Sequence, residues 1–390
     1  MVQLSEAEVV IVGGGIAGLT AAIALDRAGI NVQVVERATA LTQAGTALSL
    51  WPNALAALEH IGLRREVGSI GLTEPEGVVR DSSGKVLITV NQNLLSPDRR
   101  SQTLIVRRTD LQHLLLDACS PVPIRLNTSA ERLRVEGDSV IVDLVGGESL
   151  RASVVLACDG IRSIARSLVN NPQLTYRGRT SWRALLDDAS ALAPAAALTV
   201  GGGNQFIAGP LRDGAVYWAA DVGLKEGANQ AMTDRKGFLM DVFATWHNPI
   251  PKLIELTDND QLVIADFYDS IPSRLTAGRV ALLGDAAHPM TPDLGQGACQ
   301  GIEDAVVLAA CMRRFHDPPT ALAKYESLRL PRVRHMVRGS RRLGQLATSK
   351  SPVVVDVRNF VSRHMPVSIN ARITAGFASE DAFRRTLPRL

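Results

Sequence analysis

The stretch that most constrains the fold lies near the N-terminus and is "EVVIVGGGIAGLTAAIALDRAGINVQVVE". Its pattern predicts an apolar strand, a glycine-rich turn, a helix and a second strand, as in a parallel βαβ unit. Gly13, Gly15 and Gly18 give GxGxxG spacing, which suits a tight turn, close backbone approach to a pyrophosphate, and helix–strand packing. Glu36 ends the second strand, where a carboxylate can accept hydrogen bonds from ribose hydroxyls. The unit predicts a dinucleotide site and leaves NAD and FAD both open; the alternative is a structural turn with a chance Glu.

The next residues do not continue the strand–helix alternation of a nicotinamide dehydrogenase. A loop and a helix follow in "AGTALSLWPNALAALEHIGL", then strand-like pieces with a hairpin turn over residues 82–85. Residues 104–118 predict a strand running into a helix, with Arg107 and Arg108 at the junction. A meander with turns at 137–138 and 146–147 leads to an apolar strand that ends in Asp159–Gly160, where we expect another helix to start.

The third informative stretch is "LLGDAAHPMTPDLGQGACQGIEDA", residues 282–305. An apolar run stops at the carboxylate of Asp285, and a second helix is expected to start near Gly295. The alternative role for Asp285 is a helix N-cap or a surface carboxylate.

Three motifs in this order resemble the class A FAD-dependent monooxygenases, the single-chain aromatic hydroxylases and epoxidases. Within that family the chain is most similar to the bacterial urate hydroxylase and zeaxanthin-epoxidase-like branch. The resemblance spans roughly residues 9–342 and is carried by Gly13/Gly15/Gly18, by Asp159–Gly160 with Ser163 and Arg166, and by Gly284–Asp285 with His288, Pro292 and Gly295–Gln296–Gly297.

The resemblance implies an α/β fold with a Rossmann-like FAD-binding domain of the GR2 type. Residues 1–75, 104–175 and 273–320 would form that domain, and 76–103 with 176–272 an inserted antiparallel β-sheet substrate domain. Residues 321–390 would be a C-terminal helical segment. In the substrate domain, "RDG" at 212–214 predicts a hairpin turn.

The resemblance also implies non-covalent FAD, with NAD(P)H as a transient co-substrate and O2. Asp285 would hold the ribityl hydroxyls and Arg108 the pyrophosphate, and the helix near Gly295 would direct its positive end at the flavin ring. The expected FAD residues are Gly13, Gly15, Ala17, Gly18, Glu36, Arg37, Ser49, Arg108, Ala130, Asp159, Asp285, Gly295, Gly297 and Ala298.

For the substrate, Asp293 is the candidate base that takes a proton from a phenol or ring N–H, and the alternative is a loop carboxylate capping a helix. An arginine that pairs with substrate in the urate branch falls on Gln205 here. Losing that charge-assisted bond favours a neutral or weakly polar ring over urate. The candidates are Asp293, Tyr217 and Pro292 for catalysis, and Gln205, Tyr217, Trp182 and Phe267 for substrate contact, each of which could instead serve in the core.

The implied activity is hydroxylation or epoxidation of a small aromatic, N-heterocyclic or unsaturated molecule through a flavin C4a-hydroperoxide. The alternatives are an FAD reductase or dehydrogenase without oxygen transfer, and an FAD-bound redox sensor without turnover. A flavin halogenase usually carries a WxWxIP stretch, which "SWRALLD" does not supply.

Net charge, hydropathy and cysteine content limit the classes of partner and the cellular compartment that we expect. A net charge of +3 is too small to indicate nucleic acid, and no apolar run reaches the roughly 18 residues of a membrane helix. The N-terminus lacks a signal-peptide pattern, and the four scattered cysteines indicate neither a disulfide framework nor a metal site. We therefore expect a cytoplasmic monomer or homodimer.

Residues 325–350 form a basic stretch that predicts a helix interrupted at Pro331. We interpret its arginines as a solvated helix face, and residues 351–390 carry no motif.

Overall fold

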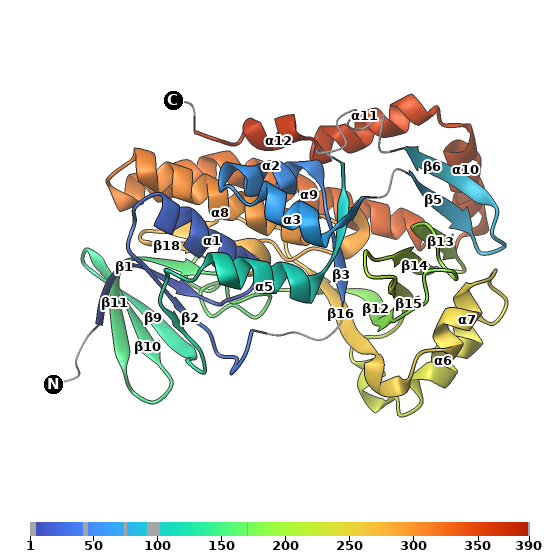
Figure 1. Cartoon of the computed structure of the whole chain (residues 1–390), viewed down its shortest axis with the longest axis horizontal. Helices are drawn as coiled ribbons and strands as arrows, with labels where there is room; N and C mark the ends of the chain where they lie inside the picture. The colour runs from blue at the N-terminus through green and yellow to red at the C-terminus, as the bar shows by residue number, and fades with distance from the viewer. Residues whose placement is uncertain (1–4, 42–45, 74–75, 92–101, 170, 389–390) are drawn as a thin grey trace.

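The computed structural model describes residues 5–41, 46–73, 76–91, 102–169 and 171–388. In these ranges the chain forms an eight-stranded, a seven-stranded and a three-stranded sheet, with a layer of helices over the first (Figure 1). Residues 92–101, part of the expected substrate domain, lie outside the described residues.

The eight-stranded sheet contains the predicted N-terminal βαβ unit. Its main path runs β17-β18-β11-β1-β2-β8, and β1 pairs in parallel with both β2 and β11. The sheet buries apolar strands on both faces, as the continuous run at residues 9–12 predicts. Its strands are β1 (Ser5–Val12), β2 (Val32–Val35), β8 (Ile124–Arg125), β9 (Ala130–Glu136), β10 (Ser139–Leu144), β11 (Ser149–Ala157), β17 (Thr276–Ala277) and β18 (Val280–Leu282).

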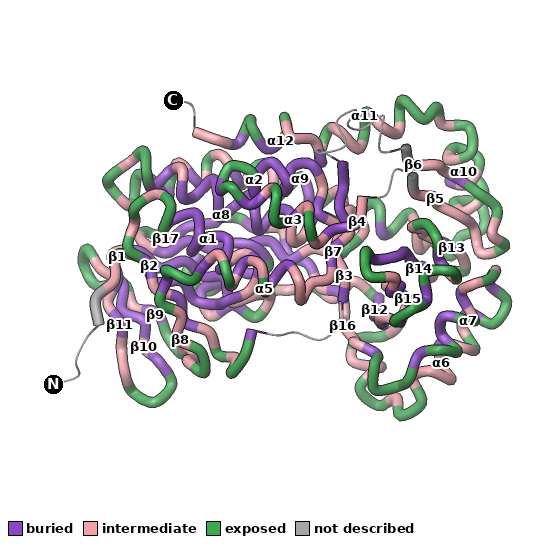
Figure 2. Tube along the Cα trace, viewed as in Figure 1, coloured by how far each residue is buried: buried purple, intermediate pink, exposed green. Residues whose placement is uncertain are grey.

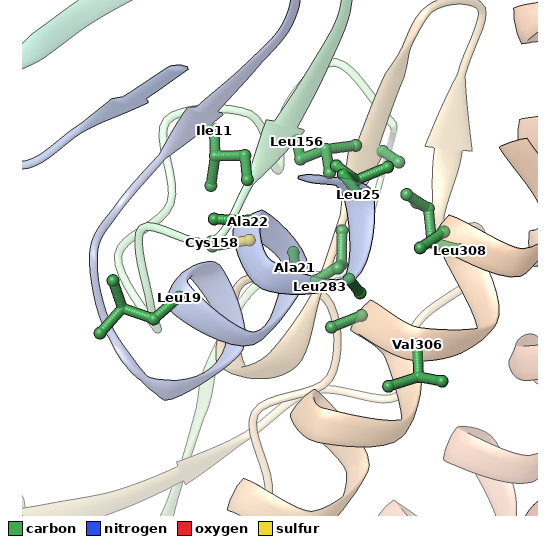
Figure 3. Close-up of a cluster of buried hydrophobic side chains, with 14 of the residues drawn as sticks. Ile11, Leu19, Ala21, Ala22, Leu25, Leu156, Cys158, Leu283, Val306 and Leu308 are labelled. Atoms are coloured by element: carbon green, nitrogen blue, oxygen red, sulfur yellow. The ribbon is translucent and has the colours of Figure 1, made fainter. Parts of the chain in front are cut away.

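Helix α1 (Ile16–Arg27) packs between this sheet and helix α8 (Gly297–Arg314). Figure 3 shows Leu25 of α1 among side chains from the strands and α8, including Leu156 and Leu308. The close packing needs glycine, because a Cβ on Gly18 would collide with the carbonyl oxygen of Gly13. The predicted packing role of Gly18 therefore has a direct steric cause.

The seven-stranded sheet joins segments far apart in the sequence, in the order β16-β12-β15-β14-β13-β5-β6. The expected hairpin at 212–214 connects β14 to β15, and β5 pairs in parallel with β13. One face packs on α6 (Arg235–Phe243) and α7 (Ile250–Glu255) through a core that includes Trp182 and Phe206. Its strands are β5 (Glu76–Asp81), β6 (Val86–Asn91), β12 (Thr175–Leu186), β13 (Ala197–Gly201), β14 (Asn204–Pro210), β15 (Val216–Gly223) and β16 (Val263–Asp269).

The remaining elements connect or cover these sheets (Figure 1). The expected strand–helix pair at 104–118 forms β7 (Leu104–Arg107) and α5 (Arg108–Ala118), and β7 lies in the three-stranded sheet between β3 and β4. The others are β3 (Ala47–Leu50), β4 (Leu72–Thr73), α2 (Pro52–His60), α3 (Arg64–Ile70), α9 (Pro318–Ala347), α10 (Pro352–His364), α11 (Val367–Ala378) and α12 (Glu380–Arg384).

Two local predictions are wrong. No helix follows Asp159–Gly160; residues 161–169 form turns, in which Asp159 Oδ2 accepts the N–H of Ile164 at 2.9 Å and Ser163 Oγ that of Ala165 at 3.1 Å. Such side-chain bonds compete with helical ones. Pro331 does not interrupt α9, which is 30 residues long in total, contains Pro331 in its interior and packs along α8.

Burial is uneven along the chain. Figure 2 shows the buried residues concentrated in α1, α8 and the central strands of the eight-stranded sheet, whereas α10 and α11 are almost without buried residues. Within the described ranges, no helix combines the length and apolar character needed to cross a bilayer.

Candidate functional site

A single large cavity of about 1620 Å³ contains most of the predicted site residues. It begins at the carboxyl ends of β1, β2, β11 and β18 and extends to the exposed face of the seven-stranded sheet. Ligands of open parallel sheets bind at this edge. Ligand pockets usually measure about 300–1,000 Å³, so this cavity has room for an extended cofactor together with a smaller molecule.

The glycine turn forms one end of the cavity. Gly13 has φ +105°, and a Cβ there would lie 2.7 Å from the carbonyl carbon of Cys158. Gly15 has no neighbouring atom within 4 Å of its Cβ position, so its backbone is open to a ligand. Glu36 lines the cavity and accepts the N–H groups of Gly14 at 2.6 Å and Ala38 at 2.8 Å. The turn is thus fixed by the Glu36 carboxylate, and its backbone at Gly15 remains open to the cavity.

Buried polar atoms without partners show that the cavity wall is built for a polar ligand. Arg108 lines the cavity, and its Nε is buried with no hydrogen bond. Burial lowers the pKa of this guanidinium, which an anion would offset. Asp159 Oδ1 is also buried and unpaired, and burial raises the pKa of that carboxyl. These groups fit the donors and acceptors of a dinucleotide.

Asp285 lies directly after β18, on the short 3₁₀ turn Gly284–Ala286. Its carboxylate is exposed to the cavity, while the neighbouring Gly284 is buried at φ +58°. The N–H of Gly284 donates to Asp304 of α8 at 3.0 Å, which fixes the turn from behind. The carboxylate is thereby presented to the cavity with its acceptor positions available for hydroxyl groups.

Helix α8 begins at Gly297, close to Gly295, near which a helix start was expected. Gly295 has the left-handed φ of +63°, and a Cβ there would lie 2.9 Å from Nε1 of Trp51. Gly297 has no neighbour within 4 Å of its Cβ position and lines the cavity with Ala298. The first turn has no acidic residue and no side-chain cap, so its N–H groups and positive end are left without a side-chain partner at the cavity wall.

A buried ionic cluster supports α8 from the side away from the cavity, and we did not predict it. Arg329 of α9 is fully buried and pairs with Glu303 and, at 2.7 Å, with Asp304. Arg332 also bonds Glu303, and His288 bonds Asp304 at 2.6 Å. Burial opposes ionisation, yet the cationic partners hold the pKa of both carboxyls below the ordinary value. For Arg329, the expected solvated face is wrong.

Asp293, the predicted base, is held by its neighbours at the boundary between the two large sheets. Its carboxylate lines the cavity but is only 2% exposed. Arg179 donates to both oxygens, at 2.9 and 2.6 Å, and Gln205 donates to one of them at 3.0 Å. Both carboxylate oxygens of Asp293 therefore already accept hydrogen bonds from protein side chains.

The remaining substrate candidates divide into two groups. Gln205, Tyr217 and Pro292 line the cavity, and burial raises the pKa of the Tyr217 phenol. Trp182 does not reach it: this side chain is fully buried on the opposite face of β12, in the core beneath α6 and α7. Phe267 is 5% exposed and lies behind the cavity wall, with the Arg179 guanidinium carbon 5.2 Å from its ring centre.

Sequence reasoning missed several charged residues that line the cavity, among them Arg183 on β12 and Asp221 on β15. The period-two alternation with Ser181 and with Tyr217 could have placed them on one face of the sheet. The position expected to carry a substrate-pairing arginine holds the neutral Gln205, but Arg183 supplies a positive charge to the same cavity. The expected preference for a neutral ring rested on the absence of such a charge.

The cofactor candidates are brought together in this one cavity, apart from Gly18, whose role is in packing. The residues that line it are Gly13, Gly15, Ala17, Glu36, Arg37, Ser49, Arg108, Ala130, Asp159, Asp285, Gly295, Gly297 and Ala298. The four cysteines are all buried and unpaired. Among the described residues, no group of His, Cys, Asp and Glu is arranged to hold a metal ion.

Comparison with known proteins gives consistent matches over nearly the whole chain. Residues 6–340 match the family described as the FAD binding domain. The aurachin C monooxygenase/isomerase of Stigmatella aurantiaca is 35% identical over 92% of this chain and 94% of that protein. The FAD-dependent urate hydroxylase of Klebsiella pneumoniae is 34% identical over 85% of this chain and 88% of its own length. The solved structure of Klebsiella pneumoniae HpxO with FAD and uric acid has a TM-score of 0.88 at 32% identity, covering 97% of each chain.

Proposed function

Since the chain belongs to the FAD binding domain family of flavoprotein monooxygenases, we propose that it uses NAD(P)H and O2 to hydroxylate a small aromatic or N-heterocyclic substrate. The protein is an FAD-dependent monooxygenase, and its relatives act on ring compounds that include urate and aminohydroxybenzoate. The observation that carries the proposal is the continuous cavity, which joins the glycine turn, the start of α8 and the face of the antiparallel sheet.

Bound FAD supplies electron transfer from NAD(P)H and activation of oxygen, and the chain supplies position and charge. Glu36 and Arg37 would hold the adenosine half, and Arg108 would donate to the pyrophosphate. Asp285 would accept the ribityl hydroxyls. The N–H groups of Gly297 and Ala298 would donate to the electron-rich edge of the ring, where the helix dipole stabilises negative charge.

On the substrate side, we propose that Tyr217 and Gln205 border the ring that is hydroxylated. Asp293 is the base candidate from the sequence, and its oxygens already accept hydrogen bonds from Arg179 and Gln205. Contacts of this kind fix the direction of the carboxylate and leave it little freedom to reach a substrate proton. We assign Asp293 a positioning role, in which it orients the Gln205 amide towards the substrate.

Replacing Asp293 by Asn tests this role. Asn keeps the size of the side chain and one acceptor for Arg179, so we expect FAD to be retained and product formation to fall by up to about 100-fold. The pH dependence of kcat/KM should be unchanged, because a positioning residue does not titrate in the cycle. Loss of an ionisation from the pH profile of the variant would instead show that Asp293 is the base.

The proposed function is tested by measuring NAD(P)H oxidation by the holoenzyme with phenols, N-heterocycles and alkenes, and the product masses under 18O2. We expect at least one ring compound to stimulate oxidation and to gain one 18O atom. Oxidation of NAD(P)H with a reduced, unoxygenated product would instead identify a reductase of the same fold. Failure of every compound to accelerate flavin reduction would favour a protein without turnover.

We further propose a cytoplasmic enzyme without nucleic-acid partners, acting as a monomer or homodimer. Four buried, unpaired cysteines suit a reducing compartment, and the small net charge does not favour binding to nucleic acid.

A further inference from the structure

Arg183 and Asp221 lie on the cavity face of the seven-stranded sheet, on adjacent antiparallel strands. Asp221 of β15 is opposite Ser181 of β12, and Arg183 is opposite Ala219. Side chains two residues apart on one strand face the same side, so both charged groups face the cavity, as its lining confirms. Diagonal neighbours of this kind are within reach of each other's long side chains.

The Arg183 guanidinium is oriented by neighbouring side chains, but among the described residues it forms no ion pair. Its Nε donates to Ser181 Oγ at 3.2 Å, and its guanidinium carbon lies 5.9 Å from the centre of the Phe267 ring. Among the described residues, no carboxylate oxygen lies within 4 Å of this guanidinium. Arg179 on the same strand differs in this respect, because both of its terminal nitrogens donate to Asp293. Arg183 therefore presents donors to the cavity.

The surface beside these two groups is apolar. Ile207 is opposite Ala219, in the same row as Arg183, and Leu198 is opposite Ile207 on the next strand. All three apolar residues line the cavity, and Ile207 is 41% exposed there. A planar ring can pack on this surface while one edge reaches the charged pair.

We propose that Arg183 and Asp221 bind one edge of a planar substrate that presents a hydrogen-bond acceptor and a donor side by side, as a cyclic amide or its hydroxy tautomer does. Arg183 donates to the ring oxygen, and Asp221 accepts from the adjacent N–H or O–H. The inference rests on the proposed function in that the ring is the one that is hydroxylated.

The proposal predicts a pH dependence of binding that follows the protonation state of Asp221. Burial raises the pKa of Asp221 above its ordinary value, and the negative charge of Asp293 acts in the same direction. A hydrogen bond from the Ser181 hydroxyl and the positive charges of Arg179 and Arg183 lower this pKa. Gln205 is opposite Asp221 on β14 and is neutral, and Tyr217 lies on the same strand. The ionised carboxylate is a stronger hydrogen-bond acceptor than the neutral acid, so binding should weaken as pH falls through this raised pKa. Removing Arg183 should move that loss to higher pH.

The test is calorimetric titration of the FAD-loaded enzyme with 2-quinolone, N-methyl-2-quinolone and quinoline-2-carboxylate. The first has adjacent N–H and C=O groups, the second lacks the donor, and the third is an anion. We expect 2-quinolone to bind about tenfold or more tightly than its N-methyl form, and Asp221→Asn and Arg183→Gln each to weaken it by a similar factor. Arg183→Gln should also shift the acidic loss of binding to higher pH.

The controls are Asp213→Asn and Arg212→Gln, at the β14–β15 turn and outside the cavity lining, which should bind 2-quinolone as the unchanged protein does. Affinity of Asp221→Asn or Arg183→Gln for 2-quinolone equal to that of the unchanged protein, no binding of 2-quinolone to the unchanged holoenzyme, or loss of FAD from either variant would overturn the proposal. So would tighter binding of the carboxylate that depends on Arg183 alone. If the variants behave as expected but no ring is oxygenated, the proposed function fails, whereas the binding of the ring edge by Arg183 and Asp221 stands.

Discussion

Asp285→Ala is expected to yield folded protein that is purified nearly free of FAD. The carboxylate is presented to the cavity directly after β18 with its acceptor positions open. Each hydrogen bond from a ribityl hydroxyl to this charged group contributes about 1.5–3 kcal/mol, so losing two weakens FAD binding by roughly 100-fold or more. The measurement is the ratio of flavin absorbance to protein absorbance after gel filtration, followed by titration of the apoprotein with FAD.

Two variants make this result interpretable. Asp285→Asn keeps one acceptor oxygen without the charge and should have intermediate FAD affinity. Asp138→Asn, whose carboxylate is 98% exposed and pairs with Arg279, should retain FAD fully. Unchanged FAD affinity in Asp285→Ala would remove this residue from the cofactor site.

Arg329→Met is expected to lower the free energy of unfolding by about 3–5 kcal/mol, because it leaves buried carboxylates with an uncompensated charge. Arg329 is fully buried between Glu303 and Asp304, and it also donates to the Gln300 side chain at 2.8 Å. Since proteins of this kind are stable by about 5–15 kcal/mol, the variant should unfold at much lower urea concentration. The measurement is urea unfolding followed by circular dichroism, with and without excess FAD.

If Arg329→Met is recovered only as aggregates, Arg329→Lys supplies the same test with the charge retained. Lys has a single ammonium group and cannot bond both carboxylates in the fork geometry of Arg, so a smaller loss is expected. The control is Arg384→Met, at a pair with Glu380 whose Arg side chain is 62% exposed; its effect should stay within about 1 kcal/mol. An Arg329→Met protein as stable as the original would contradict the role of the ionic cluster.

The parts of the fold that sequence predicted are those set by local patterns. The glycine turn, the strand–helix pair at 104–118 and the hairpin at 212–214 each follow from residues within about 30 positions of one another. The cofactor candidates were found for the same reason, because GxGxxG and the acid after a buried strand carry their geometry locally.

The parts that sequence did not predict depend on contacts between distant segments. An arginine on a helix with many basic residues resembles a solvated one, and only the packing of α9 on α8 places Arg329 beside Glu303. The turns after Gly160 replace a helix because local side chains satisfy the backbone. Trp182 and Arg183 are consecutive residues, and the sequence did not indicate which faced the core and which the cavity until both sheets were in place.

The central claim is that FAD lies along the cavity from the glycine turn to the start of α8. The most direct measurement is a crystal structure of the FAD-loaded protein. It should show the adenosine beside Glu36, the pyrophosphate at Arg108 and the ring edge within hydrogen-bond distance of the N–H groups of Gly297 and Ala298. A flavin ring seated elsewhere, or protein that takes up no FAD, would contradict the account.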